Sequence, residues 1–126
     1  KAATRMRRDG AIAPGLARPI PAASDSATIL MAHIPAAAII EQARARGVDL
    51  MLSGHTHGGQ IWPFSYAVRQ RFAKYAGPYD LDGMLLYVTR GAGSWGPRMR
   101  LWRPGEIVRL TLRAPAASPT ATIATN

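Results

Sequence analysis

Two short apolar runs with a helical pattern between them are the feature that most constrains the fold of this chain. The runs, Thr28–Ala32 and Asp49–Ser53, are typical of strands that are buried on both faces. Between them, Pro35 is a favoured first residue of a helix, apolar residues recur at helical spacing, and Gly47 is a natural helix end. The segment predicts a β–α–β unit, with parallel strands and a right-handed crossover.

The three histidines of the sequence each follow one of these predicted strands. His33 comes directly after the first, while His55 and His57 lie in the glycine-rich turn Gly54–Gln60 after the second. Parallel strands end at the same edge of a sheet, so the imidazoles should converge where α/β sheets bind ligands. A single histidine near a turn usually bonds only to backbone. A pair with a third at a matched strand end favours a metal site, because imidazole is a common metal ligand.

Composition narrows the classes of partner. The sequence contains no Cys, which excludes disulfides and thiolate ligands, and no apolar run approaches the roughly 18 residues of a membrane span. Its 16 basic and 7 acidic residues give a net charge of +9, which suits an anionic partner such as nucleic acid or a solvated basic surface. The arginines are scattered, so we favour the solvated surface.

Three segments of different character divide the chain. Residues 1–26 show no periodicity and predict an irregular lead-in, residues 27–113 predict the α/β domain, and residues 114–126 predict a disordered tail. The first residue is Lys1 and not Met, which we interpret as a sign of a fragment or a processed chain.

Two further strands are predicted after the histidine turn. The turn signal Asp82-Gly83 precedes a strand over Met84–Thr89, and the alternating pattern of Glu106–Arg113 predicts a half-buried strand. Residues 61–78 form an aromatic and basic insertion whose helical content the pattern leaves open.

A second glycine-rich run, Gly91–Gly96, matches the dinucleotide pattern Gly-x-Gly-x-x-Gly. We reject it as a nucleotide site, because Pro97 and a loop follow instead of a helix and no acidic residue lies about 20 positions on. Aromatic and basic residues interleave beyond it, which suits nucleic acid, acidic lipid head groups, or tryptophans that cover the sheet edge. We favour the covering role for these residues, which are Trp95, Arg98, Arg100, Trp102 and Arg103.

The segments that carry the histidines resemble calcineurin-like metallophosphoesterases. Residues 53–62 (SGHTHGGQIW) contain the terminal Gly-His-x-His signature of that family, and residues 32–35 its preceding Ala-His-x-Pro motif. Residues 86–97 (LYVTRGAGSWGP) and 104–112 (PGEIVRLTL) are similar to its bacterial, often membrane-associated branch. The resemblance covers Thr28–Arg113 and implies the C-terminal half of a four-layer α/β/β/α metallophosphoesterase sandwich.

The resemblance also implies a hydrolase of phosphomonoesters or phosphodiesters with two divalent metal ions, which manganese, iron or zinc would suit. His33 and His55 would bind one ion and His57 the other, and the ions would activate the water that attacks phosphorus. Around them, Arg90 would lie within reach of a substrate phosphate. The residues that shape the loop would be Gly54, Gly58 and Gly59.

The upstream metal-binding motifs of the family, Asp-x-His, Gly-Asp-x-x-Asp and Gly-Asn-His-Asp/Glu, do not occur in this sequence. We therefore expect no catalytic residue in this chain and no activity from it alone. The expected partners are a phosphoester and a membrane surface but not nucleic acid. The expected localisation is membrane-associated or cytoplasmic, in a bacterium. Two alternatives stay open, a metal-binding module without catalysis and a basic nucleic-acid-binding domain.

Overall fold

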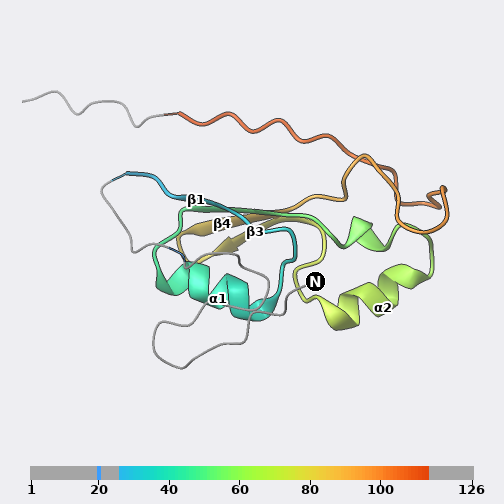
Figure 1. Cartoon of the computed structure of the whole chain (residues 1–126), viewed down its shortest axis with the longest axis horizontal. Helices are drawn as coiled ribbons and strands as arrows, with labels where there is room; N and C mark the ends of the chain where they lie inside the picture. Colours follow the sequence, from blue (N-terminus) through green and yellow to red (C-terminus); the bar gives the residue numbers. More distant parts are fainter. Residues whose placement is uncertain (1–19, 21–25, 114–126) are drawn as a thin grey trace, which may run out of the picture.

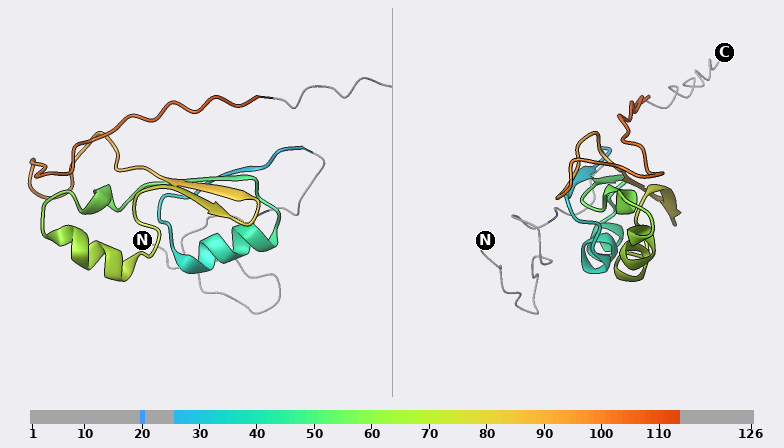
Figure 2. Two further views of the ribbon diagram at one scale, coloured as in Figure 1. Left: turned by 180° about the vertical axis from the view of Figure 1, so that it is seen from behind. Right: turned by 90° about the vertical axis from the view of Figure 1, so that its right-hand side faces the viewer.

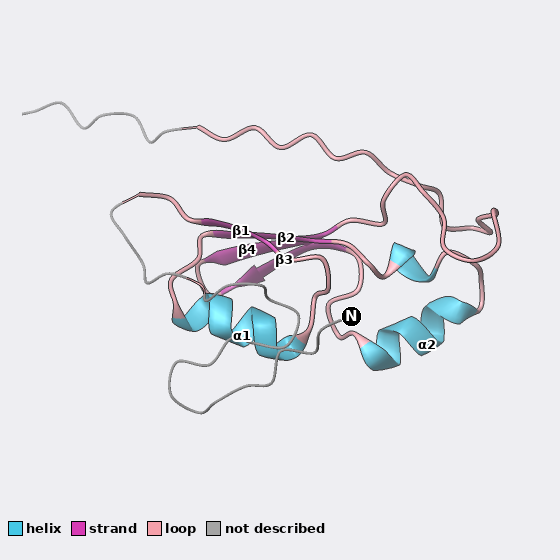
Figure 3. Cartoon of the chain, in the orientation of Figure 1, coloured by secondary structure: helices cyan, strands magenta, loops and turns pink. Residues whose placement is uncertain are grey.

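The computed structural model describes Ile20 and residues 26–113. The described residues form both helices and strands (Figures 1 and 3). The elements are, in order, β1 (Ile29–Met31), α1 (Ala37–Ala45), β2 (Leu50–Ser53), the 3₁₀ helix η1 (His57–Gly59), α2 (Phe64–Arg71), β3 (Gly77–Leu81) and β4 (Met84–Val88). The predicted lead-in and tail lie outside the described residues, apart from Ile20 and Ser26.

The strands form one four-stranded sheet in the order β1-β2-β4-β3. Strands β1, β2 and β4 are parallel, with Leu30 opposite Met51 and Met51 opposite Leu86. Strand β3 pairs antiparallel with β4 and joins it through the Asp82-Gly83 turn. The predicted β–α–β unit and the α/β class are confirmed, and the sheet with its helices matches part of a metallophosphoesterase domain.

Helix α1 covers one face of the sheet and makes the core with it (Figures 1 and 2). Ile39 and Ala43 of the helix are buried, and they meet the fully buried Met51, Leu86 and Val88 of the sheet. Burial of each large apolar side chain contributes roughly 1.5–3 kcal/mol. The helix begins at Ala37 rather than at the predicted Pro35.

The prediction of a strand over Glu106–Arg113 is wrong. This segment runs back over the side of the sheet opposite α1 without joining it (Figure 1). Ile107 is 90% exposed and Leu112 is 67% exposed, so these apolar side chains are not packed against the sheet. The pattern is that of a strand, but a strand also needs a neighbouring strand for its backbone. Within the described residues this segment forms no strand pairing, although its Glu106 amide donates to the Gly91 carbonyl at 3.0 Å.

Helix α2 lies in the insertion whose helical content the sequence left open, and strand β3, which the sequence did not predict, begins at the end of that insertion. Helix α2 lies beyond the carboxyl end of β2, on the same side of the sheet as α1 (Figures 1 and 2). Its Ser65 is buried against η1, whereas Tyr66 is 60% exposed. The helix thereby lies against the loop that carries His55 and His57.

Candidate metal centre

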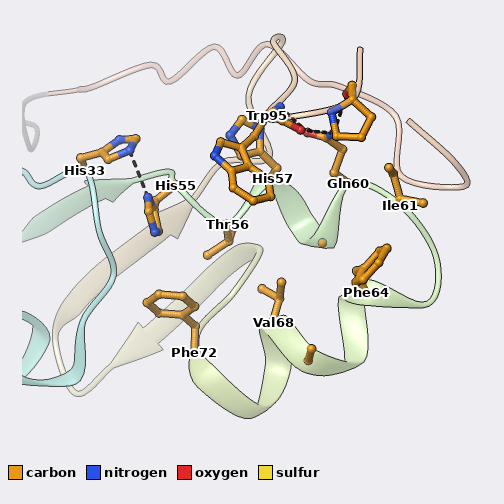
Figure 4. Close-up of a pocket in the computed structure, with 13 residues that line it drawn as sticks. His33, His55, Thr56, His57, Gln60, Ile61, Phe64, Val68, Phe72 and Trp95 are labelled. Carbon is orange, nitrogen blue, oxygen red and sulfur yellow. Dashed lines mark hydrogen bonds between the residues drawn. The ribbon is translucent and has the colours of Figure 1, made fainter. Parts of the chain in front are cut away.

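The topology brings the histidines to one edge of the sheet. His33 follows β1, and His55 and His57 follow the neighbouring strand β2. The two strand ends are joined because the Gly54 amide donates to the His33 carbonyl at 3.0 Å. All three histidines line one cavity, as Figure 4 shows.

His33 and His55 point their ring nitrogens at each other. Nδ1 of His55 lies 3.3 Å from Nε2 of His33, and the rings are edge-on with centroids 5.1 Å apart. Two nitrogens bound to one tetrahedral ion at about 2.1 Å stand about 3.4 Å apart. The pair therefore has a spacing that fits two ligands of a single ion as well as a direct hydrogen bond between the two rings.

His57 lies apart from this pair, in contact with an arginine. Nη2 of Arg100 is 3.3 Å from Nδ1 of His57. A guanidinium group only donates, so Nδ1 accepts and the ring proton of the neutral imidazole is on Nε2. A metal ion on His57 would take the Nδ1 lone pair in place of Arg100.

Burial and positive charge lower the pKa of two of the imidazoles, those of His55 and His57. Burial lowers the pKa of His55, and charge on His33 and His57 lowers it further. Burial also lowers the pKa of His57, with smaller contributions from Arg100 and His33, although a hydrogen bond with the Gly93 backbone opposes the change. Neutral imidazole is the form that binds metal, so both shifts favour ligation.

The backbone of the histidine loop is strained. His55, His57 and Gln60 adopt positive φ angles of 69°, 50° and 48°. For residues with a side chain, the left-handed region costs roughly 1–2 kcal/mol each. Such conformations persist only where surrounding contacts hold them, and they are concentrated at functional sites.

Side-chain hydrogen bonds of Gln60 join the histidine loop to a neighbouring segment. Its Nε2 donates to the carbonyls of Trp95 and Pro97 at 2.7 and 3.1 Å, and its Oε1 accepts from the Trp95 amide at 2.6 Å. Thr56 adds a hydrogen bond from its Oγ1 to the carbonyl of Tyr75 at 2.6 Å. The loop is thus fastened to the segments on both sides of the cavity.

Two of the predicted loop-shaping glycines are sites of close approach. A Cβ on Gly59 would lie 2.3 Å from Cα of Ser65 in α2, and Gly59 has a φ of +81°. A Cβ on Gly58 would lie 2.7 Å from Cγ of Arg90. Gly54 has ordinary surroundings, with Thr89 Cγ2 at 3.6 Å. The glycines after His57 let the loop lie directly on α2 and on Arg90.

Arg100 is the residue of this site that sequence reasoning did not find. Its guanidinium donates to the carbonyl of His57 at 3.3 Å and to that of Arg90 at 2.9 Å, in addition to its contact with the His57 ring. Its other acceptors are the carbonyls of Gly91, Gly93 and Arg103. No local pattern marks this role, because the carbonyls meet only when the loop has folded.

Arg90 is engaged in an ion pair with Glu106. Its Nη2 lies 2.7 Å from Oε2 of Glu106, and its backbone amide donates to Oε1 at 2.8 Å. Burial alone would raise the pKa of Glu106, but the hydrogen bonds from Arg90, its positive charge and Thr89 outweigh this and lower the pKa. A contact between Arg90 and a substrate phosphate stays a prediction.

The three histidines do not by themselves form a group that could hold a metal ion. Among the described residues, no group of three or more His, Cys, Asp and Glu is placed to hold a metal ion. The donor set fits a metal only as part of its ligand shell, since the His33–His55 pair supplies two nitrogens. Further oxygen or nitrogen ligands are required to complete four or more positions.

Several proteins are similar to this chain. A metallophosphoesterase of Campylobacter jejuni is 44% identical over 106 residues, which cover 82% of this chain and 28% of that protein. One of Helicobacter pylori is 43% identical over 71% of this chain and 24% of its own length. A transmembrane protein with metallophosphoesterase domain from Bos taurus is 40% identical over 71% and 20%. No family model and no solved structure matches the chain.

The chain belongs to the calcineurin-like metallophosphoesterase superfamily, as the resemblance of its histidine motifs predicted. It matches the C-terminal part of these relatives and spans about a quarter of the length of the first two. None of the helices in the described ranges is long and apolar enough to cross a membrane.

Proposed function

We propose that the protein is a phosphoester hydrolase with a dinuclear metal centre, to which His33, His55 and His57 contribute. The observation that carries this proposal is the pair of imidazole nitrogens 3.3 Å apart at the ends of two adjacent parallel strands. The relatives named metallophosphoesterases support it. Divalent ions held there would stabilise charge on the phosphoryl oxygens and activate water for attack on phosphorus.

The residues of this chain divide into ligands and a positioning residue. His33 and His55 face each other and would hold one ion between them. His57 would serve the second ion. Arg100 holds the backbone carbonyl of His57 and thereby sets the place of its ring. Manganese, iron and zinc all accept nitrogen ligands in such a site.

We expect the chain by itself to be catalytically inactive. Imidazole ligands do not compensate the charge of two divalent ions, and the described residues contain no group of three or more His, Cys, Asp and Glu placed to hold an ion. A chromogenic phosphodiester with added Mn²⁺ should therefore show no turnover. Measurable turnover that His57→Ala abolishes would overturn this expectation.

The ligand assignment is tested by metal binding rather than by activity. Replacing His55 with Ala removes one of the two facing nitrogens, so zinc affinity measured by titration calorimetry should fall at least about tenfold, since even outer partners of a ligand contribute that much. Gln70→Ala, on the exposed side of α2, is the control and should bind zinc normally. Normal zinc affinity in His55→Ala would refute the assignment.

A second proposed property is contact with an anionic membrane surface. The three tryptophans Trp62, Trp95 and Trp102 are 46%, 76% and 71% exposed, and the rings of Trp62 and Trp102 lie 5.4 Å apart. Residues 54–79 and 83–105 contain no Asp or Glu. Exposed tryptophan beside arginine suits the interface of a bilayer with acidic head groups.

Vesicle sedimentation tests this property. The protein should sediment with vesicles that contain phosphatidylserine but not with neutral ones, and Trp102→Ala should weaken the binding severalfold. Equal binding to both kinds of vesicle would contradict the proposed property. Binding that competing oligonucleotide abolishes while Trp102→Ala leaves it unchanged would favour the basic nucleic-acid-binding alternative instead.

A further inference from the structure

The cavity beside the histidines has two chemically different ends (Figure 4). Its volume is about 530 Å³, which is within the range of about 300–1,000 Å³ that is usual for small-molecule sites. The histidines occupy one end. The rest is lined by apolar side chains from two segments, namely Ile61, Phe64, Val68, Trp95 and Pro97. Phe72 also lines the cavity and lies beside the histidines, with its ring centroid 5.7 Å from that of His55.

The apolar end offers almost nothing polar to a ligand. Among the described residues, no Asp, Glu, Lys or Arg lines the cavity. The polar side chains that line it, apart from the histidines, are Thr56 and Gln60. Their donor and acceptor atoms already form hydrogen bonds within the protein. Thr56 donates to Tyr75, and Gln60 bonds with its amide nitrogen and oxygen to the backbone of residues 95–97.

A phosphoester with a polar esterified group therefore fits this cavity poorly. Sugar hydroxyls or a second phosphate placed against the apolar walls would lose their water without gaining partners. An unpaired buried polar group costs roughly 1–3 kcal/mol, and a buried charge more. An alkyl or aromatic group in the same place gains roughly 0.8 kcal/mol for each buried methylene.

We infer that the substrate is a phosphoester whose esterified group is apolar, an alkyl chain or an aromatic ring. Its phosphate lies at the histidines, and its apolar group extends between the Gln60 loop and the face of α2 that carries Phe64 and Val68. This inference rests on the proposed function, because it takes the histidine end as the place of the phosphate. It adds a class of substrate, which the histidines alone do not select.

A series of alkyl monophosphates tests the inference through binding, without need for turnover. Methyl, butyl and hexyl phosphate are titrated into the protein with Mn²⁺ present, and the dissociation constants are compared. Full burial of each methylene corresponds to roughly a fourfold gain in affinity, so hexyl phosphate should bind at least about tenfold more tightly than methyl phosphate. Equal affinity for the three compounds would overturn the inference.

Two substitutions on α2 show whether the gain comes from this cavity. Val68→Asp places a charge in the apolar end and should remove the preference for hexyl phosphate. Gln70→Asp adds the same charge to the same helix at an exposed position outside the lining and should keep the preference. If both variants lose it equally, the cavity is not its source and the inference fails.

A second variant covers the case in which Val68→Asp does not fold. Phe64 is 64% exposed, so Phe64→Asn should fold, and it should lower the preference for hexyl phosphate severalfold. An unchanged preference in Phe64→Asn would count against the inference.

The two proposals fail in different ways. If calorimetry detects no Mn²⁺ or Zn²⁺ binding while hexyl phosphate is still preferred over methyl phosphate, the proposed metal centre is refuted and the apolar end of the cavity stands. If metal binds and His55→Ala abolishes that binding, but the alkyl chain adds no affinity, the metal centre stands and the inferred substrate class is refuted.

Discussion

Gly59→Ala is the substitution for which the structure predicts the sharpest effect on the histidine loop. Gly59 has a φ of +81°, and a Cβ there would lie 2.3 Å from Cα, 2.6 Å from Cβ and 2.7 Å from the backbone nitrogen of Ser65. These are atoms of a helix and not the tip of a flexible side chain. Either α2 or the loop must move to accommodate one methyl group.

The expected magnitude has two parts. A side chain at positive φ costs roughly 1–2 kcal/mol. Overpacking against atoms that cannot rotate away adds roughly 1–3 kcal/mol. The total is a large share of the 5–15 kcal/mol that is usual for the stability of a domain.

Gly77→Ala is a matched control, because Gly77 has a φ of +89° and a Cβ there would meet no atom within 4 Å. The Gly77→Ala variant therefore carries only the free-energy cost of a side chain at positive φ. Urea unfolding followed by circular dichroism should therefore give a lower midpoint for Gly59→Ala than for Gly77→Ala, by about 1 M if the slope is 1–3 kcal/mol per molar urea.

Equal midpoints in the two alanine variants would refute the reasoning, since the contact with Ser65 would then have no cost. A second measurement locates the effect. Gly59→Ala should weaken zinc binding, because displaced backbone moves His57 and His55, whereas Gly77→Ala should leave zinc binding unchanged.

Two further predictions concern the contacts around the loop. Gln60→Leu removes the three hydrogen bonds that join the loop to Trp95 and Pro97, so hydrogen exchange at the Trp95 amide should become at least tenfold faster; unchanged protection would show that the contact is dispensable. The lowered pKa of Glu106 means that its ion pair with Arg90 stabilises the fold above the ordinary carboxyl pKa and that this contribution is lost as the pH falls through the lowered value. Glu106→Gln should therefore be less stable at pH 7 and show a smaller loss of stability between neutral and acidic pH; an unchanged pH dependence would contradict the assignment.

The β–α–β unit and the place of the histidines could be predicted from the sequence. Apolar runs of strand length with a helical pattern between them leave few alternatives, and parallel strands necessarily end on the same side. His33 and His55 therefore meet in the structure at 3.3 Å, although 22 residues separate them in the chain. Their role as metal ligands stays a proposal.

Strand β3 and the segment Glu106–Arg113 show where the pattern was insufficient. Strand β3 contains Gly77 and Pro78, which are depleted in strands, yet it pairs along its whole length with β4 through a tight turn. In Glu106–Arg113, apolar and polar side chains alternate as they do in a strand, but this segment forms no strand pairing with any other described segment. A strand is defined by its neighbour, and the neighbour is a property of the whole fold.

The sequence by itself determined that the three histidines reach one edge of the sheet, because the apolar patterns of two strands and the geometry of a parallel crossover bring them there. The tertiary structure alone decided what each of those side chains touches. The sequence pattern placed Arg100 among several basic residues of a glycine-rich loop and gave it no role at the site. Only the folded loop brings carbonyls and the His57 ring around its guanidinium. Arg90, which the sequence placed near a substrate phosphate, forms an ion pair with Glu106 in the structure. Such pairings depend on the meeting of loops that are distant in the chain, and no local preference of an amino acid encodes them.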